Sequence, residues 1–472
     1  MARTLGALMT PQPSRYWVET LGCPKNQVDS DKLVGTLEAD GLIAASDAGA
    51  ADVIVVNTCA FIDAARQESI DTVLALSDGR RVGARVVVTG CMAERYGDEL
   101  AAALPEVDLV AGFGVPVSLG RKPAAGESPV PSFDLLNLPR PKATAPWAYV
   151  KIAEGCDRNC GFCAIPSFRG PQRSRTIADI LDEVERLEAK EIVLVAQDLA
   201  SYGKDTSERG AIVPLIRKMA GLVPRTRLLY LYPSDLTDEL IEVIGETGVE
   251  YFDLSLQHVS KPLLRRMRRW GDGERFLRRI GDIRTRYPEA ALRSSFIVGY
   301  PGETEADHDL LLRFVEDAQL DWAGFFPFSN EDGTYAADLD AHVDAELMRE
   351  RLAEVTELQD RITADRRDAL AGTVTEVLVD SRGVARSHRE APEIDGIIRV
   401  PGDLAVGSFA TVRVIAAEGP DLVAVPVDAA PGAAPLAPAD VPTGARRRRS
   451  RSAPTVPADG GIGEAGNAGH GG

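Results

Sequence analysis

The chain has 472 residues, with 53 Lys and Arg against 71 Asp and Glu and a formal net charge of -18. This negative balance argues against a surface built mainly to hold nucleic acid, and the lack of any apolar run near ~20 residues argues against a membrane span. A chain of this size buries a large core without crosslinks, so its six Cys do not indicate a disulfide-rich secreted protein. No charged segment followed by an apolar one opens the sequence, and we expect a cytoplasmic protein with reduced thiols.

Residues 15–120 alternate between strand-like and helical segments. Three apolar, β-branched runs each end in a cysteine, namely Cys23, Cys59 and Cys91. A helical pattern follows each cysteine, over residues 27–37, 60–76 and 93–104. Strands that alternate with helices are typical of a parallel sheet with right-handed crossovers. We therefore expect a parallel α/β domain of at least three strands.

The three strand-end cysteines are predicted to converge. The carboxyl ends of parallel strands meet at one edge of a sheet, and ligands bind at that edge. A single cysteine in such a place is often just a small buried apolar residue. Three cysteines at equivalent positions favour a metal site that has three thiolates and an open fourth position.

Residues 121–146 are rich in Pro, Ala and Gly and are expected to be a connector. Residues 147–370 then contain six strand-like runs, at 148–153, 192–196, 228–232, 251–256, 294–298 and 322–328. Amphipathic helical patterns lie between them, for example at 177–187, 240–244 and 310–318. Six strands with intervening helices predict an incomplete (β/α)6 barrel, because a closed one has eight.

Cys156, Cys160 and Cys163 form a C-x3-C-x2-C motif directly after the first of these strands. A zinc site would need a nearby His, and the nearest is His258, while six Cys in a long chain argue against a disulfide framework. An iron-sulfur cluster is closed by four thiolates, so three of them leave one iron open. The motif resembles the signature of radical S-adenosylmethionine (SAM) enzymes, in which the open iron binds SAM.

Further polar residues and glycines stand at the predicted strand ends, where barrel enzymes place their chemistry. Gln197 and Asp198 follow the second strand, and Gly299 and Gly302 follow the fifth. We expect these four residues and Arg175, from the loop of the cysteine motif, to contact SAM. The alternative is that they form turns and helix caps.

Other candidates in the same region have weaker patterns. Arg169 and Arg173 belong to the loop of the cysteine motif, and such arginines either meet a bound anion or solvate a loop. His258 follows the fourth strand and could move a proton. A single His is more often a structural residue held by hydrogen bonds, and no second His stands near it in the sequence.

Residues 345–370 predict a long charged helix, after which the pattern changes to short strands separated by turn signals. These strands begin near Gly372, Gly396, Ala410 and Leu422 and predict a small antiparallel β-barrel over residues 371–428. Residues 429–472 are rich in Pro, Ala and Gly and are expected to be disordered. They contain an arginine cluster that could contact rRNA, made of Arg446, Arg447, Arg448, Arg449 and Arg451.

Residues 15–427 together resemble the radical SAM methylthiotransferases, whose last domain is called TRAM. This resemblance implies two 4Fe-4S clusters and SAM as cofactors. It implies that the C-x3-C-x2-C cysteines hold the cluster that cleaves one SAM to a 5'-deoxyadenosyl radical, which opens an unactivated C-H bond. The cluster on the three strand-end cysteines would deliver the sulfur, and a second SAM would give the methyl group.

Within this family the chain resembles the RimO branch at residues 256–258, 331–334 and 386–396. That branch modifies the β-carbon of an aspartate in the small-subunit ribosomal protein S-twelve, and another branch modifies an adenosine of tRNA. Residues 371–428 contain nine acidic residues and five arginines, a net charge of -4, which suits a basic ribosomal protein better than tRNA phosphates. The basic run at 265–269 and the arginine cluster depart from this trend, so tRNA adenosine remains the alternative.

The resemblance also implies partners. These are ribosomal protein S-twelve or the small ribosomal subunit, and an electron donor such as a flavodoxin or a ferredoxin. We expect a monomer. An alternative that is not an enzyme is a non-catalytic iron-sulfur protein that binds ribosomes. In such a protein an open iron beside glycine-rich strand ends would have no purpose.

Overall fold

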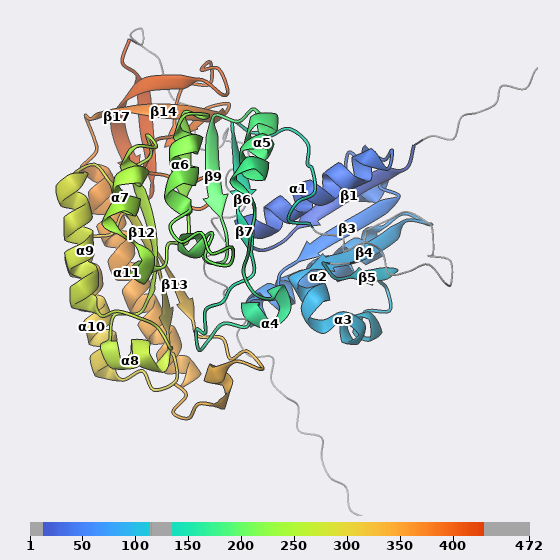
Figure 1. Cartoon of the computed structure of the whole chain (residues 1–472), viewed down its shortest axis with the longest axis horizontal. Helices are drawn as coiled ribbons and strands as arrows, with labels where there is room; N and C mark the ends of the chain where they lie inside the picture. Colours follow the sequence, from blue (N-terminus) through green and yellow to red (C-terminus); the bar gives the residue numbers. More distant parts are fainter. Residues whose placement is uncertain (1–12, 114, 116–134, 429–472) are drawn as a thin grey trace, which may run out of the picture.

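The computed structural model describes residues 13–113, 115 and 135–428. The predicted disorder of 429–472, its arginine cluster, and the connector up to residue 134 lie outside the described residues. Figure 1 shows an N-terminal α/β domain beside a larger partial barrel, with a small β-barrel at one end of the latter. This confirms the predicted fold class. Among the described helices, none combines the length and apolar character needed to cross a bilayer.

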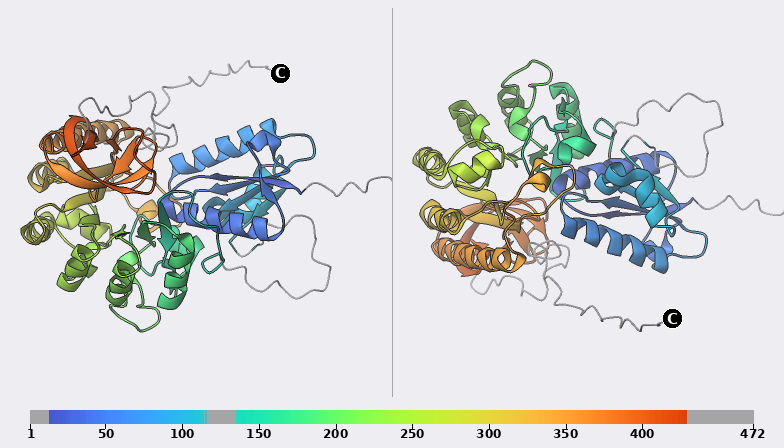
Figure 2. Two further views of the ribbon diagram at one scale, coloured as in Figure 1. Left: turned by 90° about the horizontal axis from the view of Figure 1, so that it is seen from above. Right: turned by 90° about the horizontal axis from the view of Figure 1, so that it is seen from below.

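The N-terminal domain is a five-stranded parallel sheet covered by helices on both faces (Figure 2). In spatial order its strands are β2 (Ile43–Ala44), β1 (Arg15–Thr20), β3 (Val53–Thr58), β4 (Arg85–Gly90) and β5 (Leu109–Ala111). Its helices are α1 (Pro24–Ala39), α2 (Asp63–Gly79) and α3 (Cys91–Ala103). The central strand β3 is buried along its whole length, which explains its continuous apolar and β-branched sequence.

The barrel contains the six predicted parallel strands, in sequence order. They are β6 (Trp147–Lys151), β9 (Glu191–Val195), β10 (Arg225–Leu228), β11 (Tyr251–Gln257), β12 (Ala291–Val298) and β13 (Trp322–Pro327). The third strand was predicted at 228–232, but it ends at Leu228. The reason is Tyr230, whose φ of 65° breaks the extended backbone and leaves only a Leu231–Leu254 bridge to β11.

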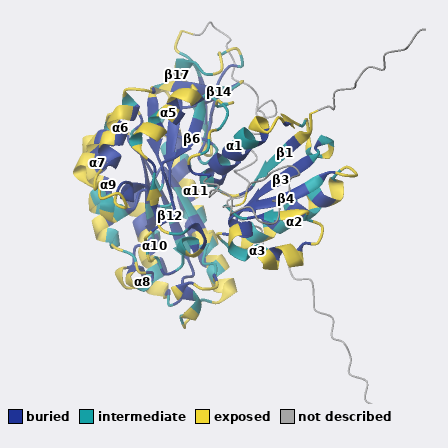
Figure 3. Cartoon of the chain, turned by 45° about the vertical axis from the view of Figure 1, so that its right-hand side comes forward, coloured by how far each residue is buried: buried dark blue, intermediate teal, exposed yellow. Residues whose placement is uncertain are grey.

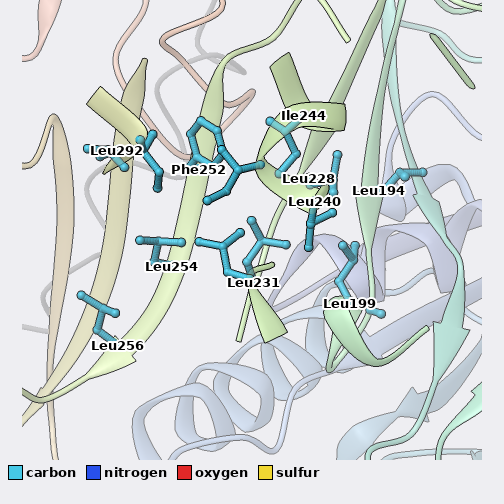
Figure 4. Packing of buried hydrophobic residues seen from close by; sticks show 14 of the residues in the cluster. Leu194, Leu199, Leu228, Leu231, Leu240, Ile244, Phe252, Leu254, Leu256 and Leu292 are labelled. Atoms are coloured by element: carbon cyan, nitrogen blue, oxygen red, sulfur yellow. The ribbon is translucent and has the colours of Figure 1, made fainter. Parts of the chain in front are cut away.

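Helices cover the outer face of these strands, which lie buried beneath them (Figure 3). They are α5 (Ile177–Leu187), α6 (Ile212–Ala220), α7 (Asp238–Gly245), α9 (Gly273–Arg286), α10 (Glu305–Ala318) and α11 (Ala345–Asp368), with the short α4 (Ile165–Arg169) and α8 (Lys261–Arg266) at one end. Figure 4 shows Leu240 and Ile244 of α7 against Leu228 and Phe252. Each such side chain contributes roughly 1.5–3 kcal/mol when fully buried.

The open side of the partial barrel is closed by α1 of the N-terminal domain. Val28 of α1 is fully buried and belongs to the same apolar cluster as Tyr149 and Val193 of the barrel. Next to it, the buried Asp29 carboxylate accepts a hydrogen bond from the Lys151 ammonium, which also contacts Glu154 at 2.7 Å. The N-terminal domain therefore replaces the missing barrel strands instead of standing apart.

The C-terminal domain is a closed barrel, as predicted, but it has five strands, because one more strand lies between the first two of the four predicted runs. It is formed by β14 (Val374–Ser381), β15 (Val384–Arg386), β16 (Ile398–Arg399), β18 (Asp421–Pro426) and β17 (Phe409–Glu418). A second detail differs from the prediction, since β16 and β18 pair in parallel while the other four pairings are antiparallel. The directions of neighbouring strands cannot alternate all the way around a closed ring of five strands, so one neighbouring pair has to be parallel.

This C-terminal domain covers the amino ends of the large barrel's strands. Its loop 387–397 accepts a hydrogen bond from Tyr149 Oη at the Pro392 carbonyl, at 2.8 Å, and one from Trp322 Nε1 at the Arg389 carbonyl, at 2.7 Å. Tyr251 Oη donates to Asp395 at 2.6 Å. The domain thus lies at the opposite end of the strands from their carboxyl ends (Figure 1).

We expect Arg386→Met to destabilise the contact between the two barrels. Arg386 is buried, lies 3.2 Å from Glu191 of β9 and donates to the mostly buried Asp380 at 3.0 Å. Glu191 keeps Arg227 at 2.8 Å, but Asp380 loses its ion-pair partner when Arg386 is removed. Breaking a buried ion pair in this way costs about 3–5 kcal/mol. Thermal unfolding should show a clearly lower midpoint, whereas Arg186→Met, which removes an exposed pair with Asp182, should change stability by about 1 kcal/mol at most. Equal shifts for both variants would contradict this.

Candidate functional site

One cavity of about 500 Å³ lies between the N-terminal domain and the carboxyl ends of the barrel strands. Its size lies within the range of about 300–1,000 Å³ that is typical of small-molecule sites. All six cysteines of the chain line it: Cys23, Cys59, Cys91, Cys156, Cys160 and Cys163. The fold therefore brings together two groups of cysteines that are far apart in the sequence.

The first group is the strand-end triad, which consists of Cys23, Cys59 and Cys91. Cys23 precedes α1, Cys59 follows β3, and Cys91 is the first residue of α3. Thiols at helix N-termini face unpaired N-H groups, which favour a thiolate. Gly22 is required beside them, because a Cβ on it would lie 2.8 Å from the Cβ of Cys59.

Asn26 ties the strand-end triad together. Its side-chain amide donates to the carbonyls of Leu21 at 2.9 Å and Thr58 at 3.1 Å, which fixes two neighbouring strand ends. Its Oδ1 accepts from Arg169 at 2.9 Å. This role could not be predicted from the sequence, because a single Asn near the start of a helix is common.

The protonation of the strand-end triad reflects burial and mutual repulsion. Burial, with the neighbouring Cys91 and Cys23, raises the pKa of Cys59 to about 12. Burial also raises the pKa of Cys91, despite the nearby Arg169. Burial opposes ionisation of Cys23 too, but Lys25 and Arg169 outweigh it and lower its pKa. Cys23 contributes to the raised pKa of both Cys59 and Cys91, so these thiols lie within electrostatic range of it.

The second group is the loop triad, Cys156, Cys160 and Cys163, between β7 (Ala153–Glu154) and α4. The Arg158 N-H donates to Cys156 Sγ at 3.4 Å, and Arg269 Nη1 donates to Cys160 Sγ at 3.2 Å. Burial is the main reason why the pKa of Cys156 is raised to about 11 and that of Cys163 to about 12.

The loop of this triad is held by contacts with the far side of the barrel. The Gly161 N-H donates to the Met267 carbonyl at 2.8 Å, and its carbonyl accepts from Ala336 at 2.7 Å. A Cβ on Gly161 would lie 2.8 Å from Tyr300 Oη. The loop therefore follows one path across the cavity, and a side chain at this position would displace it.

The chemistry of the cysteines fits iron-sulfur clusters. All six are free. In the described part of the chain, no group of three or more His, Cys, Asp or Glu side chains is close enough to hold one metal ion. N-H groups donate to the sulfurs of Cys156 and Cys160 in the loop triad and of Cys91 in the strand-end triad. Three thiols with such donors fit a polynuclear iron-sulfur cluster.

Arg169 connects the two sides of the cavity. Its Nη2 donates to Cys91 Sγ at 3.0 Å, and its Nη1 donates to Glu154 at 2.8 Å. Glu154 is buried, which disfavours its charge, but Arg169 and Lys151 lower its pKa strongly. The sequence analysis identified Arg169 as a candidate but not its partners. Lys151 and Glu154 could have been noticed, because they are charged residues in and directly after an otherwise apolar strand-like run.

The predicted SAM contacts lie in two different places. Gln197 and Asp198 line the cavity, where Gln197 donates to Glu154 at 2.7 Å and Asp198 accepts from Arg158 at 2.5 Å. Among the described lining residues, Arg175, Gly299 and Gly302 are absent.

These three residues have other surroundings. Arg175 pairs with Glu183 of α5 at 2.7 Å. The Gly299 N-H donates to Glu303 at 2.7 Å, and Gly302 lies against Arg266. Their contact with SAM stays a prediction.

Of the two roles considered for His258, the structure favours a structural residue that is held by hydrogen bonds. It is fully buried, and its Nδ1 accepts from the Ser260 N-H at 3.1 Å at the start of α8. Burial lowers the pKa of His258 to about 4. The residue is absent from the cavity lining among the described residues, so it has no access to a reacting group.

Glu331 closes the rim of the cavity between the two domains. It is buried and accepts from Arg95 of α3 at 2.7 Å and also from Arg66 of α2. It follows β13, so this contact joins the last barrel strand to the N-terminal domain. In the sequence, Glu331 stood out only as part of a family-like segment, because its two partners are more than 230 residues away.

Three family models match the chain in order. Residues 15–112 match the uncharacterized protein family UPF0004, residues 150–315 match the radical SAM superfamily, and residues 371–427 match the TRAM domain. Radical SAM enzymes use a 4Fe-4S cluster together with SAM, which agrees with the chemistry of the loop triad. A structure of the radical SAM methyltransferase TsrM from Kitasatospora setae is 14% identical, with a TM-score of 0.45 over 67% of this chain and 72% of that one, too distant to bear on function.

Close relatives match over nearly their full length. The chain is 42% identical to the ribosomal protein uS12 methylthiotransferase RimO of Saccharopolyspora erythraea, over 88% of this chain and 96% of that protein. It is 43% identical to the protein of the same name from Moorella thermoacetica, over 84% of this chain and 96% of the relative. The chain therefore belongs to the RimO family of ribosomal protein uS12 methylthiotransferases.

Proposed function

We propose that this enzyme attaches a methylthio group to the β-carbon of an aspartate in ribosomal protein uS12, the small-subunit protein S-twelve. The observation that supports this best is one cavity lined by two separate cysteine triads. A C-H bond without an acidic proton cannot be opened by a side-chain base, so the reaction needs a radical cofactor. It also needs a sulfur source within reach of the same carbon, and a second triad on the facing wall meets that need.

Each triad would hold one 4Fe-4S cluster. The strand-end triad offers the buried Cys59 and Cys91 with the half-buried Cys23, and the loop triad offers the buried Cys156 with the half-buried Cys160 and Cys163. When bound, the loop cluster with SAM supplies the one-electron chemistry that opens the C-H bond, and the other cluster supplies sulfur. The chain itself orients these groups. Arg269 and the Arg158 N-H donate to the loop sulfurs, and Arg169 donates to Cys91.

The cavity walls also fix the distance between the triads. The buried contacts of Asp29 of α1 with Lys151 and with Arg169 tie the N-terminal domain to the first barrel strand and to α4. Glu331 ties it to the last barrel strand. We propose that Gln197 and Asp198, which line the cavity, contact SAM, and that Arg175, Gly299 and Gly302 contact it as well.

The C-terminal barrel would bind the protein substrate or the ribosome. Part of its predicted acidity is internal, since Glu390 pairs with Arg367 at 2.6 Å and Asp395 with Arg293 at 3.4 Å. The solvent-exposed charges still favour acids, with Glu376, Asp403, Glu418 and Asp428 against Arg382 and Arg413. This surface suits a basic partner. Because the domain lies at the far end of the strands from the cysteines, it would hold a part of the partner distant from the modified aspartate.

The remaining assignments follow from this reaction. A ribosomal substrate places the enzyme in the cytoplasm, where a flavodoxin or a ferredoxin would donate electrons. We propose a monomer, since both triads belong to one chain. The arginine cluster at 446–451 would contact rRNA. No observation in the described residues favours the tRNA adenosine alternative or a non-catalytic ribosome-binding role.

We expect anaerobic reconstitution to give about eight iron per chain if both triads hold 4Fe-4S clusters. Cys59→Ala should lose about half of this iron and keep reductive SAM cleavage, because the loop triad is intact. Cys160→Ala should keep the other half and lose SAM cleavage. Iron analysis and quantification of 5'-deoxyadenosine check both results. Four iron per wild-type chain would rule out the two-cluster arrangement.

We expect a deletion strain to contain uS12 that lacks the methylthio group, with tRNA unchanged. Mass analysis of both substrates measures this. Complementation with the wild-type gene should restore the modification, and complementation with the Cys160→Ala variant should not. Loss of the methylthio group from tRNA, with uS12 still modified, would reverse the substrate assignment.

A further inference from the structure

Five cationic side chains line the cavity, and three of them already have carboxylate partners. Arg158 pairs with Asp198, Arg169 with Glu154 and Arg293 with Asp253. The other two, Lys25 and Arg269, form no ion pair with any carboxylate of the described residues. An uncompensated cation in a half-enclosed cavity is costly unless an anion binds there.

The two cations without a carboxylate partner differ in what else they contact. The guanidinium of Arg269 is already engaged, because it donates to Cys160 Sγ at 3.2 Å and to the Ser255 carbonyl and lies 4.1 Å from the ring centre of Tyr232. Lys25 has one contact of this kind. Its Nζ lies 3.8 Å from the ring centre of Tyr230, and within the described part of the chain its ammonium makes no hydrogen bond.

The position of Lys25 is set by both domains. It lies in the first turn of α1, two residues after Cys23, and its ammonium rests on a tyrosine of the barrel. Tyr230 has a φ of 65°, and its N-H donates to Asp253 at 3.0 Å, which fixes the backbone that carries the ring. The contact with the ring orients the ammonium but leaves its N-H donors available for an anion.

Cys23 is the thiol of the strand-end triad that interacts with this ammonium. Burial opposes both charges, but Lys25 lowers the pKa of Cys23, and Cys23 raises the pKa of Lys25. Within the described part of the chain the ammonium makes no hydrogen bond to this sulfur, and Cys91 receives Arg169 at 3.0 Å. The N-H donors of Lys25 therefore remain available for a ligand that enters the cavity beside Cys23.

We propose that the Lys25 ammonium binds the side-chain carboxylate of the aspartate that is modified, an inference that rests on the proposed function. A substrate aspartate that enters this cavity loses water from its carboxylate and needs a cation there. Its β-carbon is bonded directly to the carboxylate carbon. Holding the carboxylate beside Cys23 therefore places the reacting carbon next to the sulfur-delivering triad. A neutral adenine has no use for such a cation, so Lys25 also contributes to substrate choice.

A binding experiment with matched peptides tests this. One peptide carries the target sequence of uS12 with its aspartate, and the other has asparagine at that position. Reconstituted wild-type enzyme should bind the aspartate peptide about tenfold or more tightly, as expected for a charge-assisted contact in a cavity. Lys25→Met should bind both peptides equally, and Lys25→Arg should keep the preference. Iron content should stay unchanged in both variants.

Lys218→Met is the matched control, because Lys218 is an exposed lysine of α6 away from the cavity. It should retain the full preference for aspartate. A Lys25→Met enzyme that keeps the preference, or one that loses iron together with it, overturns the inference, since the latter would assign Lys25 to the cluster. Failure of the wild-type enzyme to bind or modify either peptide would instead count against the proposed function.

Discussion

The structure depends on how a six-stranded partial barrel is closed. Six parallel strands leave one side open, and α1 of another domain covers it with Val28 in the apolar lumen and Asp29 beside Lys151. Lys151, Glu154, Asp29 and Arg169 form one buried charged network across this boundary. Buried ion pairs add little net stability compared with apolar contacts. They are satisfied, however, in only one placement of the two domains relative to each other. That placement puts the two cysteine triads on facing walls of one cavity.

The cations around the cysteines fall into two groups, those that hold the structure together and those that are available to bind a ligand. Most cations near the cysteines have carboxylate partners in the protein, so they hold walls and loops in place. Lys25 and Arg269 do not, and they lie beside the strand-end and loop triads respectively. Positive charge without a partner inside the cavity is what anionic ligands require, and both SAM and a substrate aspartate carry carboxylates.

The opposite end of the barrel has a separate function. The C-terminal barrel inserts residues 387–397 against the amino ends of the strands, where Arg386 and Arg227 share the buried Glu191. Part of the acidity that the sequence assigns to this domain is used in such internal pairs. The exposed remainder faces solvent far from the cysteines, so the docking proposed for this domain would occur at the opposite end of the molecule from the chemistry.

The sequence by itself determined the fold class, the six barrel strands within a few residues and the family, because strand periodicity and cysteine spacing are local patterns. It also indicated that Cys23, Cys59 and Cys91 share one sheet edge. Only the tertiary structure decided which side chains face them. Glu331 meets Arg95, Asn26 meets Arg169, and Lys25 lies on Tyr230, in each case across more than 140 residues. Such pairs leave no local pattern, because their partners are chosen by the packing of one domain against another.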